Sequence, residues 1–426
     1  MKPTTSGTVF GLSRRTALLL VGIIVVFAIA AIAFTFTYGL RFSKPGGDGK
    51  AYERTAVQLL QKGFYGYKSK VPNAYMSPGY PLFLAAIYKA TGHVWATRPR
   101  TALCLIQILI ACTTILALFL IGRRLFNERI GLIAALLFAL YPPMIVATNL
   151  WLTESLATCA LVWFVFVAVL ASQRQGWRLW ALTGALLGVA VLVRPAVLPL
   201  GVAPFIALLI TGPRKDLWKG IVVCGAAWAL VMAPWVVRNE ITLHEPAVLS
   251  SHSGDPFLAG VDPYYYELGP QYQFHGPTYE HYMTTQPAGV TKDDAANAAI
   301  REGFSKHTLR YLWWFTIGKA VHAYSTGWLA TTDVDGTRSL LVRGFIVVLG
   351  WLGVAYAVRE RRLLTLALMV VIGTLVLLPF APEPRFVFSF LPLLSILAAF
   401  VLHRLWTAPT VALAASPAAP AEEGAE

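Results

Sequence analysis

Charged residues are scarce in this sequence. Only 13% of the 426 residues are Asp, Glu, Lys or Arg, whereas 57% are hydrophobic, and the mean hydropathy is +0.61. A soluble domain usually carries about a quarter charged residues, so this chain has too little polar surface for a fold surrounded only by water. The composition therefore predicts a protein that folds across a lipid bilayer.

Cysteine and acidic residues are also few. The four cysteines (Cys104, Cys112, Cys159 and Cys224) lie in apolar runs without CxxC or Cys/His spacing, which argues against a disulfide framework and a zinc site. Lys and Arg outnumber Asp and Glu by 35 to 21. In a soluble protein this excess would suggest nucleic acid, but basic cytoplasmic loops and anionic lipid headgroups account for much of it here. We expect no nucleic-acid partner.

Apolar runs of the length needed to cross a bilayer, roughly 20 residues, recur along the chain. The first follows Arg14 and Arg15 and is longer than a signal-peptide core of ~7–15 residues. We therefore expect an uncleaved span, with cleavage at the AIAAIA stretch as the alternative. Ten spans are predicted, at 16–38, 101–121, 130–147, 152–171, 179–193, 196–211, 220–236, 340–357, 363–381 and 386–402. The predicted fold is an all-α polytopic bundle with both termini in the cytoplasm.

The basic residues of the short loops support this topology, because cytoplasmic loops carry an excess of Lys and Arg. A hairpin at Arg194-Pro195 is needed to keep these loops on one side. Every short loop predicted to be cytoplasmic is basic, through Arg123, Arg124 and Arg129, then Arg174 and Arg178, then Arg214, Lys215 and Lys219, and finally Arg359, Arg361 and Arg362.

The predicted topology divides the chain into a cytoplasmic N-terminus, a membrane domain and a tail. The membrane domain contains two long exoplasmic segments with short interfacial helices, and 310–327 is expected to be one of these helices, with an eleventh span as the alternative. Ala and Pro dominate the tail, which we expect to be disordered. The boundaries are 1–15 for the N-terminus, 16–406 for the membrane domain, 39–100 and 237–339 for the exoplasmic segments, and 407–426 for the tail.

The first exoplasmic loop carries a candidate catalytic carboxylate. Asp48 lies in a Gly-flanked turn just after the first span, where a flexible backbone lets a side chain reach a cleft. Helical periodicity over Ala51–Lys62, a stop at Gly63 and a second short helix over Tyr80–Ala90 predict a structured loop. The alternative for Asp48 is a solvated turn residue.

The same loop is strongly basic. Residues 41–100 contain ten Lys or Arg and two acidic residues. One interpretation is attraction of a phosphate or another anion at the outer membrane surface. Contact with lipid headgroups is the alternative.

The third span is short and broken. Ile130 to Tyr141 covers only ~18 Å of helix before Pro142-Pro143 interrupts it. Because irregular backbone at that depth must be buried in protein or line a cavity, we expect Glu154 to face a cavity that opens outward. The alternative is a helix-start carboxylate stabilised by exposed amides.

Three arginines lie at the outer ends of spans, next to proline and apolar residues: Arg194, Arg238 and Arg385. Guanidinium groups bind phosphate in a bidentate manner, so these three are candidates to converge on one anion. Snorkelling toward the interface is the alternative for each.

In these elements the chain resembles the bacterial branch of the protein-mannosyltransferase and aminoarabinose-transferase family of the GT-C glycosyltransferase superfamily. The resemblance extends over about residues 10–403. The matching elements, in chain order, are GDGKAYERTAVQLL, SPGYPLFLAAIY, GRRLFNERIGLIAALLFALYPP, NLWLTESL, LLGVAVLVRPAVLPL, APWVVRNE with SSHSGDPFLAG, and PEPRFVFSFLPLLSILAA.

The resemblance implies an inverting transfer of a sugar from a polyprenyl-phosphate donor to a hydroxyl of a protein, lipid or glycan on the exoplasmic face. It places Asp48 at the general base and Glu154 at a second acidic position. Near the lipid phosphate or the substrate it places Arg194, Arg238 and Arg385, together with Tyr52 and Tyr80. Aminoarabinose transferases carry an acidic residue and a lysine where this chain has Met76 and Ser77, so a metal contact and the exact substrate do not carry over. The sequence leaves open whether the reaction depends on a divalent cation, and it contains no recognisable cluster of ligands for one.

Other functions are compatible with a membrane protein of this kind. A secondary transporter would show inverted repeats and polar residues near the bilayer midplane, whereas the polar candidates here cluster at outer ends. A flippase or polymerase of lipid-linked glycans and a membrane scaffold are further alternatives. The expected location is the inner membrane, with the active site on its outer side.

Overall fold

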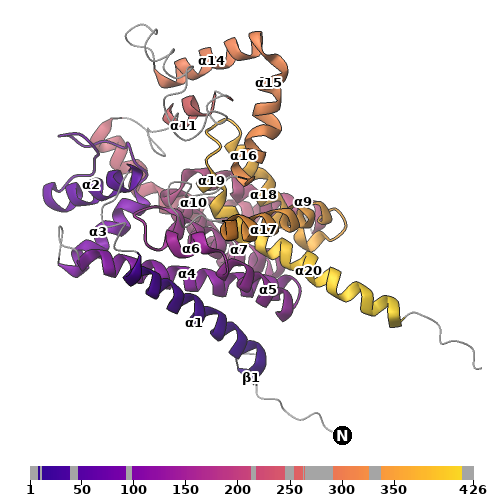
Figure 1. Cartoon of the computed structure of the whole chain (residues 1–426). Coiled ribbons are helices and arrows are strands. Elements are labelled where there is room, and N and C mark those ends of the chain that lie inside the picture. Colours follow the sequence, from indigo (N-terminus) through magenta and orange to yellow (C-terminus); the bar gives the residue numbers. More distant parts are fainter. Residues whose placement is uncertain are drawn as a thin grey trace, which may run out of the picture.

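The computed structural model describes residues 8–9, 12–38, 47–92, 98–212, 217–244, 254–261, 263, 291–325 and 337–414. Helices form nearly all of this part of the chain (Figure 1). Its strands are β1 (Thr8–Val9) and β2 (Leu12–Ser13), which pair antiparallel just before the first helix.

Five helices in the described part are long and apolar enough to cross a bilayer. They are α1 (Arg14–Thr37), α4 (Arg98–Leu125), α7 (Glu154–Arg174), α10 (Leu217–Leu243), and the stretch of α19 (Pro384–Val387), η6 (Phe388–Phe390) and α20 (Leu391–Ala414). Shorter apolar helices are α8 (Trp177–Val193), η2 (Pro195–Val202) with α9 (Ala203–Thr211), and α17 (Thr337–Tyr356). The prediction of an all-α multi-pass membrane protein is confirmed, while the count of ten spans stays a prediction.

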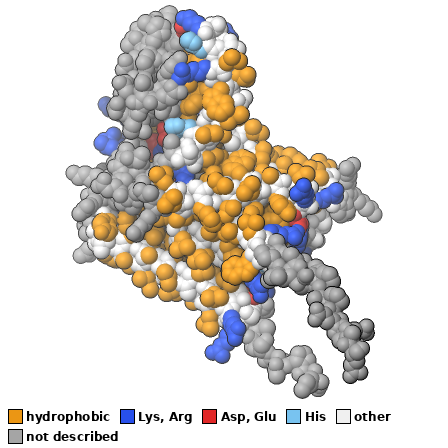
Figure 2. All heavy atoms as spheres, turned by 45° about the vertical axis from the view of Figure 1, so that its right-hand side comes forward, with side chains coloured by type: hydrophobic (Ala, Val, Ile, Leu, Met, Phe, Trp, Pro, Cys, Tyr) orange, Lys and Arg blue, Asp and Glu red, His pale blue; other side chains and the backbone are white. Residues whose placement is uncertain are grey.

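The bundle buries its helices unequally. α7 and α20 lie inside, and every residue from Leu391 to Phe400 is buried. α1 lies at the edge and exposes Leu18 and Val26 while it buries Phe27 and Ala31. Hydrophobic side chains cover the middle of the face in Figure 2, with Lys and Arg mostly toward its edges. In a bilayer the exposed apolar side chains would contact lipid.

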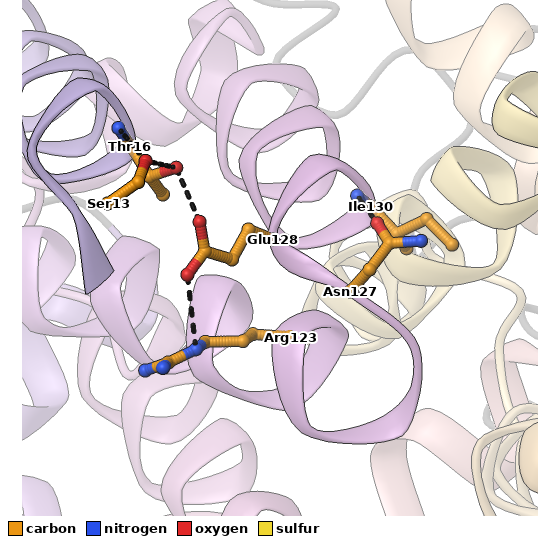
Figure 3. Close-up of polar contacts among 6 residues, drawn as sticks. All are labelled: Ser13, Thr16, Arg123, Asn127, Glu128 and Ile130. Atoms are coloured by element: carbon orange, nitrogen blue, oxygen red, sulfur yellow. Dashed lines mark hydrogen bonds and ion pairs between the residues drawn. The ribbon is translucent and has the colours of Figure 1, made fainter. Parts of the chain in front are cut away.

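A polar cluster fastens the beginning of α1 to α5 (Glu128–Ala139) (Figure 3). Thr16 donates a hydrogen bond of 2.6 Å to Glu128, whose other carboxylate oxygen lies 3.8 Å from the Arg123 Nε. Asn127 caps α5 by accepting from the Ile130 N–H. These contacts join α1, α4 and α5 at the end of the bundle that is predicted to be cytoplasmic.

Two predicted interruptions are confirmed. α5 ends at Ala139 and α6 (Pro142–Ala147) begins after the break, with Pro142 at its first position. α8 ends at Val193, and the chain then folds back so that η2 packs against α8. The two are in close contact, because a Cβ added at Gly201 of η2 would lie 2.5 Å from the Leu187 side chain of α8.

The first long loop, predicted to be exoplasmic, contains the two expected helices, α2 (Gly47–Lys62) and α3 (Gly79–Thr91). Gly63 follows α2 with φ +72°, a conformation that favours glycine. Asp48 lies in the first turn of α2, so its placement in a turn before the helix was wrong. Gly47 takes the left-handed conformation instead, with φ +47°.

The second long segment adds a group of helices at one end of the bundle (Figure 1). It contains α11 (Gly254–Ala259), α14 (Lys292–Lys306), α15 (Thr308–Trp313), the π-helical turn η4 (Trp314–Gly318) and α16 (Lys319–Ser325). Residues 310–327 are therefore helical as far as Ser325, and residues 326–327 lie outside the described part.

The last part of the chain contains η5 (Arg361–Leu363) and α18 (Leu364–Leu377) before the final helix. α20 extends to Ala414, so the disordered tail predicted from residue 407 is corrected over residues 407–414, because the Ala-rich sequence continues the helix. Residues 415–426 of that predicted tail lie outside the described part.

Candidate active site

Asp48 and Arg385 form the first ion pair of the candidate site. Asp48 occupies the first turn of α2, and Arg385 follows Pro384 at the beginning of α19. The Asp48 Oδ2 lies 2.6 Å from the Arg385 Nη2, and both side chains are partly exposed. A carboxylate from the first loop therefore meets a guanidinium from the beginning of the last span.

Glu154 and Arg194 form the second pair. Glu154 is the first residue of α7, and its Oε1 lies 3.7 Å from the Arg194 Nη2. The Arg194 Nη1 donates to the Ser389 hydroxyl at 3.2 Å. Glu154 is buried, and its Oε2 has no hydrogen-bond partner among the described residues. A buried carboxylate oxygen without a donor is costly unless a ligand or water completes its bonding.

The two pairs lie within one electrostatic neighbourhood around Tyr52. Burial is the main cause that raises the pKa of the Tyr52 hydroxyl, and the charges of Asp48 and Glu154 raise it further, while Arg385 and Arg194 lower it. Both guanidinium groups also lie beside the Phe386 ring, at 5.4 Å for Arg385 and 5.5 Å for Arg194. Four charged groups from distant parts of the sequence thus act on one hydroxyl, and two of them lie beside one ring.

Tyr80 supports the site from α3. Its ring packs edge-on against Tyr52 at 5.3 Å, and its hydroxyl lies 3.3 Å from the Gln107 Oε1. Gln107 in turn donates to the carbonyls of Thr148 and Leu150 at 3.0 Å each. This buried network fixes the irregular turn that leads into Glu154.

Gly79 brings α3 against the end of α8. A Cβ at this position would lie 2.7 Å from backbone atoms of Leu192 and Val193. Only glycine permits this approach. The contact places Tyr80 next to the hairpin that carries Arg194.

Arg238 has a different environment from the other two arginines. Its guanidinium donates to the backbone carbonyls of Tyr65 at 2.7 Å and Asn73 at 3.2 Å, and it lies over the rings of Tyr65 and Trp235. Arg194 and Arg385 therefore lie near each other, whereas Arg238 binds the loop between α2 and α3. Convergence of the arginines on one anion stays a prediction.

Glu383 is a further acidic residue near the site that the sequence did not single out. Burial raises the pKa of its carboxyl; Arg385 lowers this pKa and Asp48 raises it again. Its position directly before Pro384 and Arg385 was the available signal, because the PEPR motif places an acid and a base on one short turn.

The described residues contain no group of three His, Cys, Asp or Glu side chains that could hold a metal ion. The carboxylates near Tyr52 are each associated with an arginine. Charge balance at the site comes from guanidinium groups in the part of the chain that the structure describes.

Comparisons with known proteins agree with this architecture. Residues 76–237 match the family described as dolichyl-phosphate-mannose-protein mannosyltransferase. The archaeal oligosaccharyltransferase AglB from Archaeoglobus fulgidus, solved with an inhibitory peptide and a dolichol-phosphate, superposes with a TM-score of 0.58 at 16% identity over 97% of this chain and 53% of that chain. The chain has the GT-C glycosyltransferase fold. The resemblance inferred from the sequence is thereby confirmed.

Further comparisons define the extent of the likeness. The same A. fulgidus enzyme in its apo form gives a TM-score of 0.55 at 16% identity, over 92% of this chain and 52% of that chain. ArnT from Cupriavidus metallidurans bound to undecaprenyl phosphate gives a TM-score of 0.44 at 15% identity, over 95% of this chain and 81% of that chain. No curated protein sequence matches. The chain spans about half the length of the A. fulgidus enzyme, and its family match leaves out Asp48 and Arg385.

Proposed function

We propose that this protein transfers a hexose or pentose from a polyprenyl-phosphate donor to a hydroxyl group of a protein, lipid or glycan on the outer side of the inner membrane. The observation that carries the proposal is the meeting of the Asp48–Arg385 and Glu154–Arg194 pairs around Tyr52. Such a transfer needs a base for the acceptor and cations for the departing phosphate, and this arrangement contains both. We assign the catalytic domain to 16–406.

Arg385 and Arg194 would bind the donor phosphate. Guanidinium groups stay protonated and match phosphate oxygens in pairs, and both groups lie beside the Phe386 ring. The A. fulgidus structure holds a dolichol-phosphate in the same fold, which supports a lipid phosphate as the ligand of this chain.

Asp48 would act as the general base. Its carboxylate takes the proton from the acceptor hydroxyl while the hydroxyl oxygen attacks the anomeric carbon. The bond from that carbon to the phosphate oxygen breaks with inversion, and the electron pair leaves with the polyprenyl phosphate, whose charge the arginines stabilise. In the pair described here Asp48 contacts Arg385. A donor phosphate that engages Arg385 would compete for that contact and release the base for the acceptor.

Glu154 would orient the acceptor. Its Oε2 is buried and has no partner in the described part of the chain, and the same holds for the Asn149 Oδ1 on the preceding turn. These two buried oxygens can accept hydrogen bonds, so they suit the hydroxyl groups of a bound sugar acceptor. Tyr52 and Tyr80 would hold this wall of the site in place.

Sugar transfer by the purified protein tests the proposal. The protein in nanodiscs is incubated with radiolabelled hexosyl and pentosyl polyprenyl phosphates and with envelope extract from the source cells, and labelled product is separated from the donor. The expected result is label in a protein, lipid or glycan fraction, together with free polyprenyl phosphate. Movement of intact donor across a sealed vesicle without release of polyprenyl phosphate would contradict transfer and favour a flippase.

A further inference from the structure

A polar cavity lies along α2, and its lining does not include the carboxylates of the candidate active site. It has a volume of about 430 Å³ and is formed by α2 together with the loop that follows it. Its lining residues are Glu53, Arg54, Val57, Gln58, Gln61, Lys62, Lys68, Ser69 and Lys70. Four of these side chains are cationic, and one is acidic.

The charges in this basic pocket are poorly balanced. Among the residues that the structure describes there, Arg54, Lys62, Lys68 and Lys70 face one carboxylate, that of Glu53, and burial raises the pKa of that carboxyl. Lys292 of α14 adds a fifth cation near these residues. Burial is the main cause that lowers the pKa of Lys292, and the charge of Lys68 lowers it further, which shows that the two side chains are close. Like charges held together repel one another unless an anion lies among them. The pocket therefore favours an anionic ligand.

The walls of the basic pocket are fixed by the fold. Arg54, Gln58 and Gln61 share one face of α2 because they follow at intervals of four and three residues, and Lys62 lies four residues after Gln58. The loop wall is held by reciprocal hydrogen bonds between Tyr67 and Asn73, of 3.0 and 2.9 Å.

Two further features mark the pocket as a built site. Arg238 binds the backbone of the same loop at both ends, through the carbonyls of Tyr65 and Asn73. The Gln58 Nε2 is buried without a hydrogen-bond partner among the described residues. A buried amide of this kind can donate to a bound oxyanion.

The position of the basic pocket relates it to the proposed reaction. Gln58 lies ten residues after Asp48 on the same helix, which corresponds to ~15 Å at 1.5 Å per residue. A ligand that bridges this distance is larger than one sugar. A flat basic surface is enough to contact lipid headgroups. This pocket is instead concave, with walls from α2 and from the loop after it, which suits one anionic group of a larger acceptor.

We propose that the basic pocket binds a phosphate or carboxylate group of the acceptor and so selects an anionic acceptor for the hydroxyl that reacts at Asp48. This inference rests on the proposed function. The same anion chemistry occurs in free phosphate and in the headgroups of anionic lipids, so the experiment separates these sources.

Lysine footprinting tests the binding without any transfer. The protein in phosphatidylcholine nanodiscs is acylated with a lysine reagent in inorganic phosphate or in chloride of equal ionic strength, and modified lysines are quantified by mass spectrometry. Phosphate is expected to slow acylation of Lys62, Lys68 and Lys70 several-fold and to leave the exposed Lys89 of α3 unchanged. Equal rates in the two salts would overturn the proposal. Protection by phosphatidylglycerol nanodiscs without free phosphate, to the same degree, would assign the pocket to headgroups and would also overturn it.

Transfer kinetics complete the test. They use as acceptor the envelope fraction that the wild-type protein labels in the transfer assay. The Lys68→Gln/Lys70→Gln variant should raise the KM for the acceptor several-fold and leave the donor KM unchanged, whereas Lys89→Gln should change neither. A rise in donor KM alone would overturn the assignment to the acceptor. A wild type that binds phosphate in the footprint and transfers no sugar would refute the proposed function and not the anion site.

Discussion

Asp48 and Arg385 belong to opposite ends of the chain, yet their side chains meet at 2.6 Å between Oδ2 and Nη2. The contact joins the first turn of α2 to the beginning of α19. It also brings the proposed base to a guanidinium proposed to receive the donor phosphate. We therefore expect different consequences from substitutions at arginines that look alike in the sequence.

Arg385→Lys should raise the KM for the donor by about tenfold, because an ammonium group cannot bind phosphate oxygens in the bidentate manner of guanidinium. Arg238→Lys should instead lower the melting temperature and leave the donor KM unchanged, because Arg238 holds the carbonyls of Tyr65 and Asn73. Donor titrations and thermal unfolding of both variants measure these effects. A donor effect at Arg238 equal to that at Arg385 would contradict the division of roles.

Glu383→Gln should lower turnover and change the pH dependence of kcat. Burial raises the pKa of the Glu383 carboxyl above its ordinary value of 4.5, so Glu383 is expected to titrate on the acidic limb of the profile. Removal of this carboxyl should remove that step. Glu240→Gln, at an exposed position of α10, is the matched control. An unchanged acidic limb in Glu383→Gln would show that Glu383 does not act on Arg385 or Asp48.

Gly79→Ala should destabilise the fold by about 1–3 kcal/mol, the usual cost of overpacking a tight contact. The added Cβ would lie 2.7 Å from the backbone of Leu192 and Val193, so α3 must move away from the hairpin that carries Arg194. Turnover should fall with stability. Gly225→Ala, inside α10, adds a Cβ that meets nothing within 4 Å and should keep or raise the melting temperature, because Ala favours a helix over Gly. Equal melting temperatures for both variants would refute the close contact.

Lys319→Met should change how stability depends on pH. Lys319 is 1% exposed, donates to the carbonyls of Leu378 and Pro379, and burial lowers its pKa to about 6. The unfolded chain keeps this lysine protonated up to its ordinary pKa of about 10.4. Between these values the unfolded state binds more protons, so this residue makes the free energy of unfolding rise with pH.

The difference in melting temperature, Lys319→Met minus wild type, should therefore fall from pH 6.5 to pH 8.5. Lys306→Met, at an exposed residue of α14, should show a difference that does not depend on pH. A constant difference for Lys319→Met would mean that Lys319 stays charged in the folded protein.

Local features of the sequence predicted much of the helical scaffold. The helices of the first loop, the stop at Gly63 and the break before Pro142 depend on periodicity, glycine and proline, which act over a few residues. The meeting of Asp48 with Arg385 depends on how distant helices pack, and no local pattern determines that. Arg238 shows the same limit, because its partners lie on a loop far from it in the sequence.

Glu383 shows a different limit. Its neighbours in the sequence are Pro384 and Arg385, and the PEPR motif alone is compatible with a solvated turn. Burial by the surrounding helices, together with the nearby Asp48, gives its carboxyl a raised pKa. Tertiary packing therefore determines which acidic residues join the site.

The turnover of Asp48→Asn is the most direct measure of whether Asp48 is the general base. Asparagine keeps the size of the side chain and cannot accept the acceptor proton, so kcat should fall by roughly 10²–10⁴-fold with donor binding retained. Asp293→Asn, at an exposed position in the first turn of α14, should keep the wild-type rate. Sugar transfer by Asp48→Asn at the wild-type rate, with a competent donor and acceptor, would contradict the account.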